Sequence, residues 1–418
     1  MTRLDHPLAL DEPRASAPSA SADTFWRNLE PQAPDALLAI IRHYREDSRP
    51  GKIDLGVGIY RDEQGRTPVM AAAKAAEGLL WQTQPTKAYL GAEGDVVYTA
   101  LLAQLALGES LARSDRLVGV QTPGGTGALR LGAELLARAS PGATVWTSEP
   151  TWPNHGPIFT QAGLRMRTHR YYRAGDREVD VHGMLADLAH ARPGDVILLQ
   201  ASCHNPTGAT LGPADWRQIA GLCERKGLTP FLDLAYQGLG DGLEEDAAAT
   251  RLLLNELPDA LVAYSCDKNF GLYRDRVGAL WVQSESSERS DAVYSNMLAL
   301  ARSLWSMPPD HGAAVVRTVL EADDLRAKWS AELDTMRGRI NALREALGAS
   351  HPALAPLARQ RGMFALLPLA PAQIAALRAE RGVYMAGNGR INLCGLTLAT
   401  VPDLLDALRH YLPEDLGA

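Results

Sequence analysis

Four short apolar runs separated by helical patterns limit this chain to a small set of folds. Each run is apolar on both faces and is bounded by turn residues, which is typical of strands covered by helices on both sides of a sheet. Strands of this kind that alternate with helices predict an α/β protein with a largely parallel sheet. The expected strands span residues 117–121, 195–201, 229–234 and 260–265.

The length of the chain and its C-terminal pattern predict a second, smaller unit. At 418 residues the chain exceeds the size at which a single hydrophobic core stops growing. Residues 323–350 have the pattern of one long amphipathic helix, which can bridge two domains. Beyond it we expect short strands at 363–368 and 390–394 and a terminal helix near 401–411. Residues 1–24 are rich in Ser, Ala and Pro and are expected to form a flexible tail.

The composition argues against several classes of function. A formal net charge of −7 gives no basic surface for nucleic acid. No segment reaches the roughly 18 apolar residues that a membrane span requires, and the first residues lack the pattern of a secretory signal. Four scattered cysteines, Cys203, Cys223, Cys266 and Cys394, favour neither a disulfide framework nor a zinc site. We therefore expect a cytoplasmic protein that holds no metal.

Lys268 is the first candidate for chemistry, in the segment Ser265–Tyr273 that follows an expected strand. A lysine in such a place is usually a solvated surface residue, and an amine with a pKa of about 10.4 is almost fully protonated at neutral pH. A nucleophilic lysine needs a buried or electropositive site, or a covalent bond to a cofactor. Arg276 follows eight residues later and could bind a phosphate, although an arginine considered alone is more often a surface residue.

A glycine-rich turn, Pro123–Arg130, lies between an expected strand and a helical pattern. Glycines let backbone N–H groups approach an anion, the helix N-terminus adds a partial positive charge, and the Thr126 hydroxyl can donate a hydrogen bond. Such turns join many strands to helices, so the turn alone is a weak signal. It matches neither the Walker phosphate loop nor the dinucleotide fingerprint.

Asp233 and Asn205 are polar residues placed at or near strand ends. Asp233 interrupts an apolar strand, where a carboxylate is costly unless it faces a cation such as a protonated pyridine nitrogen or is satisfied by backbone donors. Asn205 precedes Pro206, and its amide could bind a ring hydroxyl, although the two residues could also form only a turn. Open α/β sheets bind ligands at this edge, beyond the carboxyl ends of their strands.

Together these segments resemble the class I aminotransferases of the aspartate and aromatic amino acid type, which use pyridoxal 5′-phosphate (PLP). The similarity runs from about Phe25 to the C-terminus. It rests on Gly56–Tyr60, Tyr89–Gly91, Pro123–Arg130, Thr151–His155, His204–Gly208, Asp233–Gly238, Lys268–Tyr273, Pro308–Pro309 and Gly389–Asn392.

The resemblance implies fold type I of the PLP transferases. That fold has a large domain with a mostly parallel seven-stranded sheet and a smaller α/β domain. The expected parts are the flexible tail 1–24, an N-terminal segment 25–63 that packs with the small domain, the large PLP-binding domain 64–325 and the small domain 326–418. A homodimer with shared active sites is also implied.

The resemblance assigns roles around the cofactor by position. Lys268 would bind PLP covalently and move the proton at the substrate Cα, Asp233 would pair with the pyridinium nitrogen, and Tyr236 and Asn205 would bind the ring hydroxyl. The residues implied for the phosphate are Gly125, Thr126, Ser265, Arg276 and, from a second subunit, Tyr89. Trp152 would stack on the ring, and His155 would support Asp233.

Other positions carry roles in substrate binding. Arg390 would hold the substrate α-carboxylate, with Gly58, Trp152 and Asn205 nearby. Arg302 would reach across the dimer interface to a distal carboxylate, and Phe364 would line the same pocket.

The substrate is left open between acidic and aromatic amino acids. Arg302 implies aspartate and glutamate with their 2-oxo acids, including 2-oxoglutarate, but members that accept tyrosine and phenylalanine keep this arginine too. Trp305 and Met307 replace a tyrosine and an asparagine common near that site, which makes strict aspartate specificity less secure. Asp267 replaces the small residue usual before the lysine, and its role is unexplained.

Two other classes share part of this set of residues. A lyase or decarboxylase of the same fold would keep Lys268, Asp233 and Arg276, whereas Arg302 and the Asn205–Pro206 context favour amino transfer. A non-catalytic PLP-binding regulator would not need a base, an electron sink and a carboxylate clamp together. We therefore expect transamination in two half-reactions with ping-pong kinetics.

Overall fold

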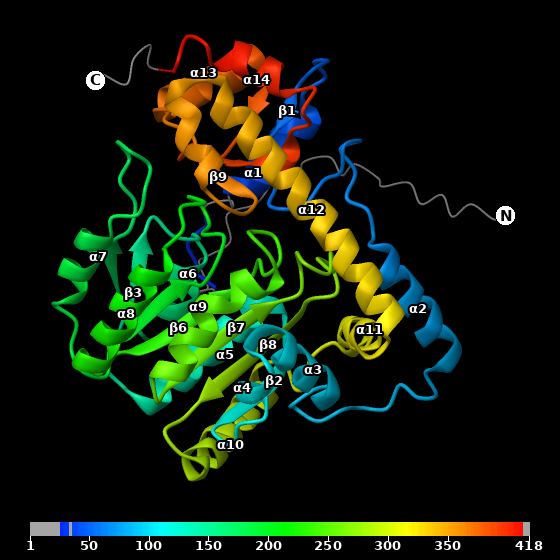
Figure 1. The fold of residues 1–418 in the computed structure, drawn as a ribbon, viewed down its shortest axis with the longest axis vertical. Helices are drawn as coiled ribbons and strands as arrows, with labels where there is room; N and C mark the ends of the chain where they lie inside the picture. The colour runs from blue at the N-terminus through cyan, green and yellow to red at the C-terminus, as the bar shows by residue number, and fades with distance from the viewer. Residues whose placement is uncertain (1–25, 33–35, 413–418) are drawn as a thin grey trace, which may run out of the picture.

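A seven-stranded sheet forms the centre of the computed structural model, which describes residues 26–32 and 36–412 (Figure 1). The strand order is β2-β8-β7-β6-β5-β3-β4; β8 is antiparallel to both of its neighbours, and the other pairs are parallel. The prediction of an α/β fold with a mostly parallel seven-stranded sheet is confirmed. The flexible tail expected at 1–24 lies outside the described residues.

Four of the seven strands, β2, β5, β6 and β7, match the expected apolar runs closely, whereas no run was expected at β3, β4 or β8. The bounds of the seven strands are β2 Leu117–Pro123, β3 Thr144–Glu149, β4 Arg165–Arg170, β5 Val196–Gln200, β6 Thr229–Leu234, β7 Ala260–Ser265 and β8 Val277–Gln283. The strand expected at 195–201 is thus shorter by one residue at each end, and the one expected at 117–121 continues to Pro123.

Helices cover both faces of the sheet. The helices of the described residues, including those of the smaller unit, are α1 Ala36–Glu46, α2 Ala71–Thr83, α3 Val96–Leu107, α4 Glu109–Ala112, α5 Gly124–Ala139, α6 His155–Gln161, α7 Val181–Leu188, α8 Pro213–Lys226, α9 Leu243–Glu256, α10 Ser287–Leu304, α11 Asp310–Glu321, α12 Asp323–Ser350, α13 Pro371–Arg381 and α14 Val401–Leu408, with 3-10 turns at Pro352–Arg359 and Leu393–Gly395.

Successive residues of a strand point to opposite faces, and here they enter two separate cores. In β5, Ile197 packs with the cluster under α3, α8, α9 and α11, whereas Leu198 packs with the cluster under α5, α6 and α10. In β6, Phe231 belongs to the second cluster. Asp233, two residues later, therefore projects to the same face, toward α6.

A third apolar cluster belongs to the smaller unit at the top of Figure 1. It is built around short strands: β1 Ile53–Asp54 pairs in parallel with β10 Val383–Tyr384, and β9 Phe364–Leu366 pairs antiparallel with β11 Arg390–Asn392. The long helix α12 runs from this unit down along the larger one. It has the bounds expected for the bridging helix.

Three elements of the smaller unit are shorter than expected. The strands expected at 363–368 and 390–394 are each three residues long, and a 3-10 turn that begins at Leu393 ends the second of them. The terminal helix ends at Leu408, three residues before the expected end.

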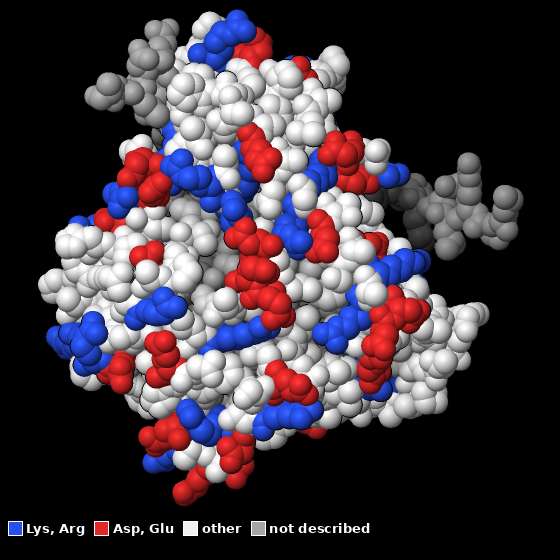
Figure 2. Space-filling view, in the orientation of Figure 1, with Lys and Arg blue, Asp and Glu red and all other residues white. Residues whose placement is uncertain are grey.

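The charged surface is mixed in sign. Figure 2 shows Lys and Arg side chains interspersed with Asp and Glu on the face drawn, with no continuous basic stripe. Within residues 26–32 and 36–412, no helix combines the length and the apolar character that crossing a membrane requires.

Candidate active site

A cavity of about 340 Å³ opens at the carboxyl ends of β5, β6 and β7. The structure brings most of the predicted residues to it. Those that line it are Gly58, Gly125, Thr126, Trp152, Asn205, Asp233, Tyr236, Ser265, Lys268, Arg276, Phe364 and Arg390. The lining therefore joins residues around the large sheet to Gly58, Phe364 and Arg390 of the smaller unit.

One side of the cavity has the features of an anion cradle. The helix α5 begins at Gly124, so the N–H groups of Gly125 and Thr126 belong to its first turn, which has no partners within the helix. A Cβ added to Gly125 would lie 3.0 Å from the Cβ of Ser265, which shows how closely helix start and strand end approach. Only glycine allows this approach without a shift of the neighbouring chain.

Arg276 completes the cradle from the loop before β8. Its backbone has a φ of 55°, a left-handed conformation that is unfavourable for a residue with a side chain and that is found more often at functional sites. A Cβ added to Gly124 would lie 2.5 Å from Arg276 Nη2, so the guanidinium lies directly against the start of α5.

The cradle already holds a carboxylate of the chain, that of Asp267. Arg276 Nη1 donates to Asp267 Oδ2, and Lys268 Nζ lies 3.6 Å from the same oxygen. The Asp267 side chain is only 7% exposed, and its Oδ1 has no hydrogen-bond partner in the described part of the chain. The residue that the sequence left unexplained is therefore the counter-ion of Arg276.

The floor of the cavity is a buried chain of hydrogen bonds. His155 Nε2 lies 3.1 Å from Asp233 Oδ2, and His155 Nδ1 lies 2.8 Å from Thr151 Oγ1. The imidazole is fully buried, and the Trp152 ring meets it edge-on with centroids 5.2 Å apart. This arrangement fixes the carboxylate of Asp233 from behind and leaves it facing the cavity.

Tyr236 and Asn205 flank the floor. Burial raises the pKa of Tyr236 well above its ordinary value, so its hydroxyl stays protonated. Lys268 Nζ lies 5.7 Å from the centre of the Tyr236 ring. Asn205 is held by its backbone N–H, which donates to Gln200 Oε1 at 2.8 Å, and its own Oδ1 is buried without a partner among the described residues.

Arg390 borders the cavity from β11 of the smaller unit. Its Nη2 donates to Gly56 O at 2.9 Å, and its guanidinium lies 4.8 Å from the centre of the Phe364 ring. Burial lowers the pKa of Arg390, and Nε finds no partner among the residues described. A Cβ added to Gly58 would lie 3.2 Å from Phe364 Cζ, so this glycine keeps the entrance open.

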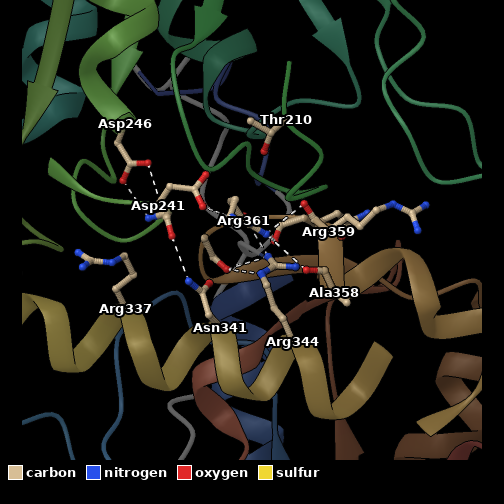
Figure 3. Close-up of polar contacts among 12 residues, drawn as sticks. Thr210, Asp241, Asp246, Arg337, Asn341, Arg344, Ala358, Arg359 and Arg361 are labelled. Carbon is tan, nitrogen blue, oxygen red and sulfur yellow. Dashed lines mark hydrogen bonds and ion pairs between the residues drawn. The ribbon is translucent and has the colours of Figure 1, made fainter. Parts of the chain in front are cut away.

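A second buried arginine, Arg344 on α12, holds the segment that carries Phe364. It donates to the carbonyl oxygens of Leu357, Arg361, Gly362 and Phe364. Figure 3 shows its guanidinium among these contacts, with Asn341 projecting from the same helix. Burial lowers the pKa of Arg344 to about 9.

The same segment is tied to the loop after β6. Asp241 accepts from Arg361 Nε at 2.5 Å, and Arg361 N donates to Gly208 O at 2.8 Å (Figure 3). Asp246 accepts from the backbone of Gly240 and Asp241 and so holds that loop. Phe364 is therefore placed by contacts to both units.

Three predicted residues do not line the cavity. His155 lies behind Asp233, as described above. Tyr89 is 93% exposed in the connection between α2 and α3, and Arg302 is exposed near the end of α10, where it donates to Ser306 Oγ.

Sequence reasoning also missed two residues that shape the site. Gln200, which positions Asn205, ends an expected strand, and its place at a strand end could have found it. Arg344 gave no signal, since it is one of several arginines on an amphipathic helix.

The lining fits the cofactor that the resemblance implies. The cradle offers a helix start, hydroxyl groups and an arginine to a phosphate, and Asp233 offers a buried carboxylate to a protonated ring nitrogen. The unpartnered Asn205 Oδ1 and Arg390 Nε are polar atoms whose burial is costly until a ligand satisfies them. Lys268 lies among these groups.

Comparison with known proteins identifies the family. Residues 50–408 match the model of "Aminotransferase class I and II". The tyrosine aminotransferase of Rhizobium meliloti is 50% identical over 90% of this chain and 97% of its own length, and the aspartate aminotransferase of Escherichia coli is 40% identical over 92% and 99%. The structure of the aromatic-amino-acid aminotransferase of Burkholderia pseudomallei, covalently bound to pyridoxal phosphate, is 37% identical and superposes with a TM-score of 0.91, covering 93% of this chain and 100% of that one.

The family model spans most of the chain, and the relatives named above are similar over nearly their whole length. These matches give no support to the alternatives of a lyase or decarboxylase and of a non-catalytic regulator. The chain belongs to the class I and II aminotransferases and is a PLP-dependent enzyme that transfers amino groups between amino acids and 2-oxo acids.

Proposed function

We propose that this aminotransferase prefers aromatic amino acids as donors, also accepts aspartate, uses 2-oxoglutarate as acceptor, and works through Lys268. The observation that carries this proposal is the cavity itself. It supports the proposal because Lys268 lines it together with the residues proposed as the phosphate cradle and with the buried Arg390.

The residues around the cofactor have separable tasks. PLP, when bound, stabilises the negative charge that develops at the Cα of an amino acid. Gly125, Thr126, Ser265 and Arg276 bind its phosphate, and Asp233 pairs with its ring nitrogen. The hydrogen bond from His155 keeps the Asp233 carboxylate aimed at the cavity. Tyr236 and Asn205 bind the ring hydroxyl.

Lys268 acts as the mobile base. A proton at Cα can be removed quickly only by a group held at bonding distance, because positioning replaces a bimolecular encounter. Lys268 Nζ lies in the cavity with one carboxylate oxygen 3.6 Å away and no other carboxylate among the ion pairs described for it. Nζ is therefore available to accept the proton from the substrate Cα and to donate it again, as each of the two half-reactions would require.

Arg390 binds the substrate α-carboxylate. A guanidinium presents paired N–H groups that match both oxygens of a carboxylate. Here it is desolvated, it has only a carbonyl and the Phe364 ring as described partners, and its Nε is free. Binding a carboxylate therefore satisfies a group whose burial is otherwise costly.

The preference for aromatic donors rests on the lining and on the relatives. Val57, Ile59 and Phe364 present apolar surface to the cavity beside Arg390. Phe364 also meets Tyr236 edge-on, with ring centres 6.0 Å apart, which leaves an aromatic wall for a substrate ring. The tyrosine aminotransferase relative is more similar in sequence than the aspartate aminotransferase relative.

A homodimer with shared sites is part of the proposal. Helix α2, the connection around Tyr89 and the start of α3 expose Trp81, Tyr89, Leu90 and Val96, which is a large apolar surface for a monomer. Leu90 N lies 3.0 Å from Met307 Sδ, so the Tyr89 connection adjoins the loop that follows Arg302. One partner surface could therefore carry both residues into the neighbouring cavity.

The domain limits and the cellular location also stay proposals. The separate apolar cluster around β1, β9, β10 and β11 supports a small unit that includes 25–63 and 326–418, with 64–325 as the large domain. Four cysteines are all buried and unpaired, which supports a reducing compartment such as the cytoplasm.

The test is a comparison of kcat/KM for tyrosine, phenylalanine and aspartate with 2-oxoglutarate. We expect turnover of all three, with the aromatic donors at least about tenfold above aspartate, equivalent to roughly 1.4 kcal/mol of transition-state binding. With a donor and no acceptor, one equivalent of 2-oxo acid should form. A preference for aspartate would contradict the aromatic assignment, and release of CO₂ with the cofactor unchanged would contradict transamination.

A further inference from the structure

We propose that Asp267 is an internal competitor of the cofactor phosphate for Arg276, and that it weakens the hold of this enzyme on its cofactor. The proposal rests on the proposed function of the cavity as a PLP site. It concerns a residue that takes the place of the small side chain usual before the lysine.

The first step is the position of the carboxylate. Asp267 follows directly after the end of β7, and its Oδ2 accepts a hydrogen bond from Arg276 Nη1. Asp267 and Arg276 line the cavity together with Thr126 of the α5 N-terminus. The carboxylate therefore occupies the anion cradle and is not a surface charge that solvent screens.

The second step is the charge that remains for a phosphate. Arg276 and Asp267 sum to zero, and the start of α5 contributes only about half a positive charge. A phosphate ester at neutral pH carries about −1.5 to −2. A cradle with an uncharged residue in place of Asp267 would offer one full positive charge more to the same anion.

The third step is the free oxygen. Asp267 Oδ1 is buried and has no hydrogen-bond partner in the described part of the chain. An ionised carboxylate can only accept hydrogen bonds, so Asp267 Oδ1 cannot form a hydrogen bond with the oxygens of an ionised phosphate. Phosphate binding thus sets two like charges side by side in a site of low dielectric, and this repulsion reduces affinity.

Pyridoxamine 5′-phosphate and inorganic phosphate are the sharpest probes. Neither forms a covalent bond to Lys268, so their binding is free of that contribution, and inorganic phosphate reports the cradle alone. The aminated form of the cofactor is held during turnover without a covalent bond to the enzyme, so it depends more on the cradle. The effect of Asp267 should therefore be largest at that stage.

The experiment uses the full-length enzyme freed of cofactor, with D267N, D267S and a control. D267N keeps the shape of the side chain and removes its charge, whereas D267S restores a small residue. The control, D187N, removes another arginine-paired aspartate, whose partner Arg170 is exposed and far from the cavity. Dissociation constants are measured by fluorescence titration, and phosphate protection by the shift in Tm.

We expect both Asp267 variants to bind pyridoxamine 5′-phosphate about tenfold or more tightly, and to be protected by lower concentrations of inorganic phosphate. D187N should match the wild type. If either folded variant binds as the wild type does, or more weakly, the proposal is wrong and Asp267 instead positions Arg276. If the wild type does not bind one equivalent of pyridoxamine 5′-phosphate in the cavity, the proposed PLP site is wrong as well. The two failures are therefore distinguishable.

Discussion

Two arginines border the cavity, and they are satisfied in opposite ways. Arg276, in the large sheet, is 39% exposed in its side chain and paired with the Asp267 carboxylate. Arg390, in the smaller unit, is buried, hydrogen-bonds a carbonyl oxygen, and has no carboxylate partner among the residues described. One anion site therefore contains its own counter-charge, whereas the other is left for the ligand.

The difference suggests how strongly each site depends on what it binds. A desolvated arginine without a counter-ion gains most from a carboxylate, because the ligand supplies the only full opposite charge. An arginine that already has a counter-ion must divide its charge between that counter-ion and the ligand. Arg344 shows a third case: it is buried, but the carbonyl oxygens around it use its N–H groups, so it supports structure and binds no ligand.

The largest effect is expected at Arg390. R390A should lower kcat/KM for every donor by about a thousandfold, since it removes a charge-assisted paired contact worth roughly 4 kcal/mol. R390K keeps the charge but not the paired geometry, so its kcat/KM should lie between the values of the wild type and of R390A. Steady-state kinetics with tyrosine and aspartate check this. A loss below about tenfold would show that another group binds the α-carboxylate.

A hundredfold effect is expected at Arg276. R276A should weaken binding of pyridoxamine 5′-phosphate by about a hundredfold, roughly 3 kcal/mol, because it removes the cation and leaves Asp267 facing the phosphate. In a D267N background the same substitution should cost clearly more, because Arg276 is there not shared with Asp267 and gives its whole charge to the phosphate. Titration of the four proteins of this double-mutant cycle gives the coupling. Equal losses in both backgrounds would mean that the two residues act independently.

A smaller effect, on stability, is expected at Arg344. R344M should lower the free energy of unfolding of the cofactor-free enzyme by about 2 kcal/mol, because buried carbonyl oxygens lose their donors. Denaturant unfolding measures this change. The matched control is R337M on the same helix, whose guanidinium has only one such carbonyl contact, at 3.2 Å. A stable R344M variant with a large loss of substrate affinity would instead make Arg344 part of the binding site.

The smallest effect is expected at Phe364. F364L should lower kcat/KM for phenylalanine relative to aspartate by about fivefold, roughly 1 kcal/mol, since it removes one aromatic partner of the substrate ring. The ratio of the two specificity constants is the measurement. An unchanged ratio would remove the aromatic wall from the account of specificity.

The sequence predicted the central strands β5, β6 and β7 because they are buried on both faces and have continuous apolar sequences. It did not predict β3 and β8, although both lie inside the sheet. It did not single out β4, an edge strand in which Arg165, Arg167 and Arg170 are exposed and interrupt the apolar pattern. The two-residue strands β1 and β10 are too short for any period to show.

The candidate site was predictable where a residue stands at a strand end within a motif, as Lys268 and Asp233 do. Contacts between distant segments were not. The pairing of Asp267 with Arg276 depends on the left-handed backbone at Arg276, and the role of Arg344 depends on carbonyl oxygens that carry no sequence signal. Tyr89 and Arg302 are exposed in a single chain, so their predicted roles require the proposed dimer.

The most direct test of the account is to locate the covalent bond between enzyme and cofactor. The purified holoenzyme is reduced with borohydride, digested and analysed by mass spectrometry, before and after treatment with excess tyrosine. The account predicts the cofactor mass on Lys268 before treatment and its loss from that lysine afterwards. Labelling of a different lysine, or labelling of Lys268 that tyrosine leaves unchanged, would contradict it.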